Sequence, residues 1–139
     1  MRIHLKRPKS KYYDESRYKI FIDGVKVAVL TENQSKEVEV NSNTLTIESK
    51  LVTSWSGSKV LALSVSEGDV IEFTTNPWFV KLGIILPAII PLLWVFTYSA
   101  ENPWLKWPFI GLLIVDLTAL FYILVIARRK WVNIHHKQQ

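Results

Sequence analysis

The fold of this chain is decided by two apolar stretches, FVKLGIILPAIIPLLWVFTYSA at residues 79–100 and FIGLLIVDLTALFYILVIA at residues 109–127. A helix needs about 20 apolar residues to cross the roughly 30 Å hydrocarbon core of a bilayer. Both stretches reach about that length, and Lys81 and Asp116 are their only charged residues. The sequence therefore predicts two membrane spans, which the short link of residues 101–108 joins into an antiparallel hairpin.

Basic residues near the ends of the spans indicate how the hairpin crosses the membrane. Cytoplasmic flanks of membrane spans carry an excess of Lys and Arg. Arg128, Arg129 and Lys130 follow the second span and Lys81 begins the first, whereas the link carries only Lys106. We therefore expect both termini to lie in the cytoplasm. We also expect Lys81, Arg128, Arg129 and Lys130 to contact lipid headgroups. The alternative, with both termini outside, puts the arginines on the unfavourable side.

The N-terminal half has a different pattern, with short β-type runs separated by turn signals. Asp23-Gly24 stands between two apolar runs, which is a strong hairpin signal. Valines alternate with glutamates over residues 37–40, and Ile3 and Leu5 suggest an edge strand. Six or seven such strands predict an all-β head, a small antiparallel sandwich or barrel, followed by the transmembrane hairpin.

These patterns predict three parts. A cytoplasmic β-sandwich domain covers residues 1–76, the transmembrane hairpin covers 77–127, and a basic cytoplasmic tail covers 128–139. The N-terminal region is polar and basic and has no apolar signal segment. A compact hairpin without an export signal suits a bacterial inner membrane, where we expect a multi-pass protein.

Part of the head resembles a known type of module. A strand-turn-strand run, IFIDGVKV at residues 20–27, is followed by the alternating run KEVEV at 36–40 and by LTI at 45–47. Over residues 20–50 this order is similar to PEGA-type small β-sandwich modules, although the Pro-Glu-Gly-Ala signature is absent. The resemblance implies a non-catalytic β module that serves in surface or membrane assemblies, and it implies no ligand.

Asp116 is the sharpest candidate for a functional residue. An acid near the middle of a span is costly and normally faces a helix partner or a wet cavity. At ~1.5 Å per residue, Asp116 lies roughly 12 Å from Pro108 along a helix. Two interpretations follow, a proton or cation site and a hydrogen-bond clamp between helices, and a single acid favours the clamp.

Two prolines in the first span belong to the same hypothesis. Pro87 and Pro91 cannot donate backbone hydrogen bonds, which leaves two helix carbonyls in need of partners inside a membrane. A protonated Asp116 could donate to one of them, and Tyr98 and Thr118 are further candidate partners. The prolines themselves form either a hinge beside a pathway or, as we favour, a static kink.

Most chemical functions have no support in the sequence. Cysteine is absent, which excludes disulfides and thiolate nucleophiles. Phosphate-binding, metalloprotease and nucleophile-elbow motifs are also absent, so we expect neither an enzyme nor a cofactor. His135 and His136 are adjacent on a predicted mobile tail, which does not define a metal site. No motif supports nucleic-acid binding by the basic N-terminal residues.

Three function hypotheses remain, and the third of them is a lipid-sensing membrane anchor that uses its basic residues at the membrane rims. The first is a small accessory or scaffolding subunit, whose hairpin packs into a larger membrane assembly and whose β head lies at the cytoplasmic face. The alternative is a homo-oligomeric channel or transporter with Asp116 in the pathway. The first two imply membrane lipids as partners, together with a membrane-protein partner or self-association.

Overall fold

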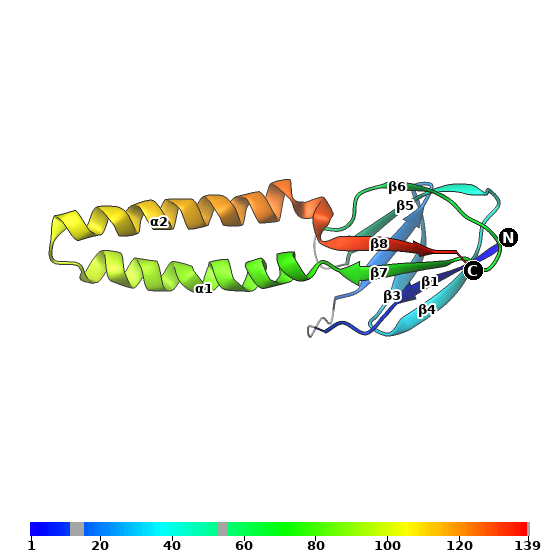
Figure 1. Ribbon diagram of the computed structural model, residues 1–139, viewed down its shortest axis with the longest axis horizontal. Coiled ribbons are helices and arrows are strands. Elements are labelled where there is room, and N and C mark those ends of the chain that lie inside the picture. The colour runs from blue at the N-terminus through cyan, green and yellow to red at the C-terminus, as the bar shows by residue number, and fades with distance from the viewer. Residues whose placement is uncertain (12–15, 53–55, 139) are drawn as a thin grey trace. The chain divides into compact units, whose positions relative to one another are not determined.

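The computed structural model describes residues 1–11, 16–52 and 56–138. It divides the chain into two compact units. The first unit is a β head made of Met1–Asn76 together with Arg128–Gln139, and the second is the helical segment Pro77–Ala127. The helices are therefore an insertion between the last two strands of the head (Figure 1).

The described part of the head forms eight strands in two four-stranded sheets. The first sheet has the order β4-β1-β7-β8, and its strands are β1 (Arg2–Arg7), β4 (Gln34–Glu39), β7 (Val70–Thr75) and β8 (Val132–Lys137). The second has the order β3-β2-β5-β6, and its strands are β2 (Tyr18–Ile22), β3 (Val25–Leu30), β5 (Thr44–Leu51) and β6 (Leu61–Ser64). The head is thus all-β, as the sequence predicts, but it has eight strands instead of six or seven, and it is not purely antiparallel because β1 pairs parallel with β7.

The additional strand, β8, comes from the segment for which the sequence predicts a basic tail. β8 pairs antiparallel with β7, from Val70 opposite Lys137 to Thr75 opposite Val132. Val132 belongs to the hydrophobic core and Ile134 packs against it. The tail prediction is therefore wrong for this segment. The apolar residues alternate as in a half-buried strand, but the partner strand lies on the far side of the hairpin in the sequence.

β1 is an interior strand and not the predicted edge strand. It pairs antiparallel with β4 and parallel with β7, and its inward side chains Ile3 and Leu5 are fully buried. The next inward residue is Arg7, whose guanidinium lies 3.9 Å from the ring centroid of Tyr18 and donates to backbone carbonyls. The ring face and the carbonyls compensate the buried charge, so Arg7 is not a surface cation.

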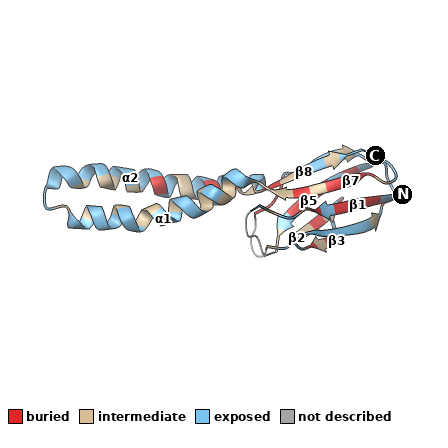
Figure 2. Cartoon of the chain, turned by 60° about the horizontal axis from the view of Figure 1, so that its bottom comes forward, coloured by how far each residue is buried: buried red, intermediate tan, exposed pale blue. Residues whose placement is uncertain are grey.

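The hydrophobic core lies between the two sheets. Buried residues alternate with exposed ones along the strands, which appears in Figure 2 as interrupted red bands. Ile20 and Ile47 from one sheet and Ile71 and Phe73 from the other are fully buried. Each such side chain contributes about 1.5–3 kcal/mol relative to exposure, so the core requires both sheets.

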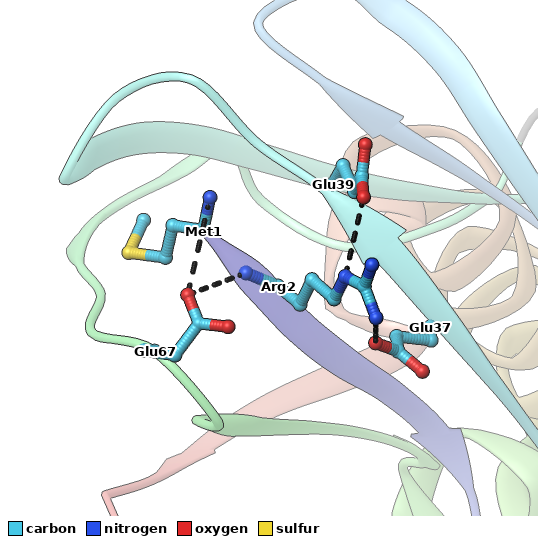
Figure 3. A network of polar contacts seen from close by, with 5 residues as sticks. All are labelled: Met1, Arg2, Glu37, Glu39 and Glu67. Atoms are coloured by element: carbon cyan, nitrogen blue, oxygen red, sulfur yellow. Dashed lines mark hydrogen bonds and ion pairs between the residues drawn. The ribbon is translucent and has the colours of Figure 1, made fainter.

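Arg2 forms a polar network at the start of β1 (Figure 3). Its Nε lies 3.2 Å from Oε1 of Glu39, and its Nη1 lies 3.5 Å from Oε1 of Glu37. Its backbone N–H donates to Glu67 at 2.8 Å, and the Met1 ammonium lies 3.9 Å from the same carboxylate. The network joins β1 to β4 and to the turn before β7, and it compensates the charge of Arg2.

Gly57 joins the edges of the two sheets. Its N–H donates to the carbonyl of Arg128 at 2.8 Å, and its own carbonyl accepts from the N–H groups of Trp131 and Val132, at 3.1 Å each. A Cβ atom at this position would lie 2.1 Å from the carbonyl oxygen of Ser49 in β5. Only glycine therefore permits residue 57 to lie this close to β5 while it also bonds to the segment that leads into β8.

The helical unit contains α1 (Pro77–Ser99) and α2 (Pro103–Phe121), the latter continued by a π-helical turn (Tyr122–Ile126). Two helices, Pro77–Ser99 and Pro103–Ile126, are long and apolar enough to cross a membrane. The second begins inside the link predicted from the sequence. The reason is local: Asn102 accepts a hydrogen bond from the Trp104 N–H at 3.0 Å, and Pro103 takes the first helical position.

The first prediction concerns Gly57. We expect Gly57→Ala to lower the free energy of unfolding of the head by about 1–3 kcal/mol, because the new methyl group collides with backbone that cannot move independently. The measurement is denaturant unfolding of the full-length protein in detergent, followed by its β-sheet circular dichroism. Gly111→Ala is the control, since a Cβ there meets nothing within 4 Å. Equal effects of the two changes would contradict the prediction.

The second prediction concerns Glu72 on β7. The Lys137 ammonium donates to this carboxylate at 2.9 Å, and this hydrogen bond is the largest cause that lowers the pKa of Glu72. A carboxyl with a lowered pKa stabilises the fold above its unfolded pKa, and that contribution disappears as the pH falls through the folded pKa. We expect the free energy of unfolding to fall in acid.

Glu72→Gln should remove this part of the pH dependence and cost up to about 1 kcal/mol at neutral pH. Unfolding curves of the full-length protein, recorded from neutral pH down to about pH 3, test this. Glu101→Gln removes an exposed carboxylate of the helical unit as a control. Parallel pH curves for the Glu72→Gln and wild-type proteins would contradict the role of Glu72.

Candidate functional site

The two membrane-length helices shelter one face each, at alternating steps of three and four residues. In α2 and the turn that follows it, the sheltered residues at this spacing are Phe109, Leu113, Asp116, Leu120, Ile123 and Ala127, and Ile110 and Ala119 beside them are half-buried too. On α1 they are Phe79, Gly83, Leu86, Ile90, Leu93 and Thr97. This spacing is typical of helices that pack as in a coiled coil. Beside this face, the rings of Phe96 and Phe109 stack with centroids 5.4 Å apart, which shows that these two residues lie at the same level of the antiparallel pair.

Asp116 lies on the seam. It is 7% exposed, and its Oδ2 atom is buried without a hydrogen-bond partner among the described residues. Asp116 follows Phe109 by seven residues. Because the helices are antiparallel, the same count back from Phe96 puts it level with about Ile89. A buried polar atom left unpaired lowers stability by about 1–3 kcal/mol. Asp116 therefore destabilises the packing of the two helices when no donor reaches it.

The other residues predicted for this site lie elsewhere on the hairpin. Pro87 and Pro91 are exposed, away from the sheltered face of α1. Tyr98 is 85% exposed. Thr118 is exposed as well, and its hydroxyl donates to the carbonyl of Ile114 in its own helix at 2.7 Å. The structure therefore buries Asp116 in the seam but does not bring these four residues to it.

The surface of the hairpin outside the seam is apolar. A groove of about 630 Å³ lies between the helices and is lined by side chains that include Leu82, Leu86, Val115 and Ala119. In α1 no residue is buried, and in α2 only Asp116 is. The hairpin therefore leaves most of its apolar surface available to lipid or to partner helices.

The predicted lipid-facing basic residues fall into both units. Lys81 is exposed on α1, whereas Arg128, Arg129 and Lys130 form a 3-10 turn that leads into β8. Arg129 and Lys130 line a hollow of the head together with Lys59. Sequence reasoning missed Lys59, because no local pattern connects it with residues about 70 positions later in the chain.

The paired histidines are not a mobile tail. His136 lies on β8, and its Nε2 is 2.7 Å from Oδ2 of Asp69, a carboxylate that also accepts the Ser66 N–H at 2.9 Å. His136 therefore contributes a contact between β8 and the turn before β7. The part of the chain that the structure describes holds no group of three or more potential metal-ligating His, Cys, Asp or Glu residues.

Comparison of the chain with protein-family models, with curated proteins and with solved structures gives no match. The architecture therefore defines the protein by itself: a two-sheet β head with an inserted hairpin of two membrane-length helices. The likeness of residues 20–50 to PEGA-type modules stays a prediction, although strands β2 to β5 do occur over this range.

The third prediction concerns Asp116 in the isolated protein. We expect Asp116→Leu to stabilise the seam by about 1–3 kcal/mol, because it replaces an unpaired buried polar group by an apolar one. Hydrogen exchange of the amides around residue 116 in detergent should slow about tenfold or more. Leu117→Val alters an exposed side chain of the same helix outside the groove between α1 and α2 and should change little. Faster exchange in Asp116→Leu would show that Asp116 already has a partner within the hairpin.

Proposed function

We propose that this protein is a small accessory or scaffolding subunit of a membrane protein assembly. Its hairpin packs among partner helices, and its β head lies at the cytoplasmic face. The observation that supports this most is the Oδ2 atom of Asp116, which is buried without a donor among the described residues. Polar groups inside membranes are usually satisfied by a neighbouring helix, so the donor that completes this site comes from a partner side chain that inserts between α1 and α2.

The surface of the hairpin supports the same proposal. Large apolar side chains such as Ile84, Leu112 and Phe121 are at least half exposed. The apolar groove between α1 and α2 offers a place for side chains of a partner helix. Without a hydrophobic driving force between helices in lipid, close packing and hydrogen bonds drive association, and this hairpin offers a groove for the first and Asp116 for the second.

The way in which the head is assembled constrains the side of the membrane on which it lies. Because the head is assembled from residues before and after the hairpin, both ends of a membrane-spanning hairpin must lie on one side. The positive-inside rule assigns that side to the cytoplasm, since Arg128, Arg129 and Lys130 follow the second span. A bacterial inner membrane is the setting that we propose.

The alternative is a homo-oligomeric channel or transporter with Asp116 in its pathway. The same unpaired oxygen supports it, because an intramembrane carboxylate can hold a proton or a cation. Asp116 faces the seam of its own hairpin, so this pathway has to pass between α1 and α2 of each copy. That requirement makes the channel the second choice.

The fourth prediction is a test of these proposals. Tagged protein is purified from its native membrane in mild detergent, and the intact complex is weighed. We expect a different membrane protein in fixed ratio. Asp116→Leu should reduce its recovery at least tenfold, because it removes the polar contact, whereas Asp116→Asn should retain it.

One outcome would contradict the accessory role, and another would contradict only the contribution of Asp116 to it. A complex that contains only copies of this chain would favour the channel, and loss of ion flux with intact assembly in Asp116→Asn would then assign Asp116 to the pathway. Full recovery of the partner by Asp116→Leu would show that Asp116 does not contribute to the interface.

A further inference from the structure

A hollow of about 430 Å³ lies in the head beside the edge strands β6 and β8. We call it the basic hollow. Ser58, Lys59 and Leu61 line one side of it, and β8 lines the other. Asn76, Arg129 and Lys130 complete the lining. Its volume lies within the range of small-molecule sites, about 300–1,000 Å³.

The basic hollow carries uncompensated positive charge. Lys59, Arg129 and Lys130 are exposed, and none of the three forms an ion pair with any described residue. No carboxylate is among the lining residues. Elsewhere in the head, Lys137 is paired with Glu72. Three unpaired cations around one concave surface attract an anion.

Backbone hydrogen bonds hold the lining of the basic hollow in place. The Asn76 side chain donates to the carbonyl of Lys130 at 3.0 Å, and the Asn76 N–H donates to the carbonyl of Trp131 at 2.8 Å. Gly57 bonds to the carbonyl of Arg128 and to the Trp131 N–H. The chain that carries Arg129 and Lys130 is therefore fixed before any ligand binds, which lowers the entropic cost of binding.

The position of these residues in the chain indicates the anion. Asn76 immediately precedes Pro77, the first residue of α1, and Arg128 immediately follows Ala127, the last residue of the helical unit. When the hairpin spans a bilayer, residues at the ends of its spans lie at the depth of the lipid headgroups. The anion concentrated at that depth is the phosphate of a phospholipid.

We propose that the basic hollow binds the headgroup phosphate of an anionic phospholipid. Lys59, Arg129 and Lys130 contact the phosphate oxygens, the guanidinium in a bidentate manner. Leu61 and Ile134 in the same lining contact the less polar glycerol portion. This inference rests on the membrane insertion contained in the proposed function, and it does not depend on any protein partner.

The test compares two double variants of the full-length protein in detergent. Lys59→Gln/Arg129→Gln removes two cations of the hollow and leaves Arg128 and Lys130 as topology signals. Lys26→Gln/Lys36→Gln removes two exposed cations on β3 and β4 that form no ion pair with the residues that the structure describes. Native mass spectrometry measures binding of phosphatidylglycerol against phosphatidylcholine. All substitutions are on exposed side chains, and circular dichroism checks that each variant folds.

We expect phosphatidylglycerol affinity to fall about tenfold or more in the first variant and less than about twofold in the second, since each basic residue near the surface contributes about a factor of five. Equal losses in both variants would overturn the proposal, because diffuse attraction would then explain binding. Equal binding of the two lipids by the wild-type protein would also overturn it.

Two further measurements separate the possible failures. If inorganic phosphate binds the hollow as tightly as phosphatidylglycerol does, the ligand of the hollow is a free anion and not a lipid. Reconstitution into phosphatidylcholine vesicles tests insertion alone. Failure to float with these vesicles would overturn the proposed function together with the lipid site. Normal flotation without selectivity for phosphatidylglycerol would overturn only the lipid site.

Discussion

The pairing of β7 with β8 is the constraint on which the rest of the structure depends. Thr75 lies opposite Val132, so two neighbouring strands hold both ends of the inserted hairpin. Adjacent strands are about 4.8 Å apart, whereas packed helices need 8–10 Å, and the connections at residue 76 and at residues 128–131 accommodate that difference. The same pairing places Val132 in the core, which makes the head dependent on residues from both sides of the hairpin.

Most buried charged groups of the described head are compensated, although the Ser49 hydroxyl is buried without a hydrogen-bond partner among the described residues. Arg7 has an aromatic face and carbonyls, and Asp69 accepts from His136 and from a backbone N–H. Among the described residues, Asp116 in the hairpin has an unpaired buried oxygen, and no carboxylate lines the hollow that Lys59 and Arg129 share, although Arg129 also borders a neighbouring hollow with Glu48. Uncompensated groups cost stability, and natural proteins usually carry such costs at functional sites.

The two candidate sites belong to one view of the protein as a membrane component. In a membrane-spanning hairpin, the unpaired oxygen of Asp116 needs a hydrogen-bond donor at the depth of the hydrocarbon core. The basic hollow attracts an anion near the residues where the spans begin and end. Under the two proposals above, one site contacts a protein partner and the other contacts lipid. Gly57 relates to the second site, because its hydrogen bonds hold the segment that carries Arg129.

The sequence by itself determined the features that depend on local composition. Apolar length predicts the two spans, Asp23-Gly24 predicts the turn between β2 and β3, and the charge and depth of Asp116 mark it without any structure. Only the tertiary structure decided that β8 exists, that β1 is an interior strand, that Asp116 faces the seam, and that Lys59 joins Arg129. The physical reason is that turns and helical periods are set by neighbouring residues, whereas strand partners and shared cavities depend on contacts between segments distant in the chain.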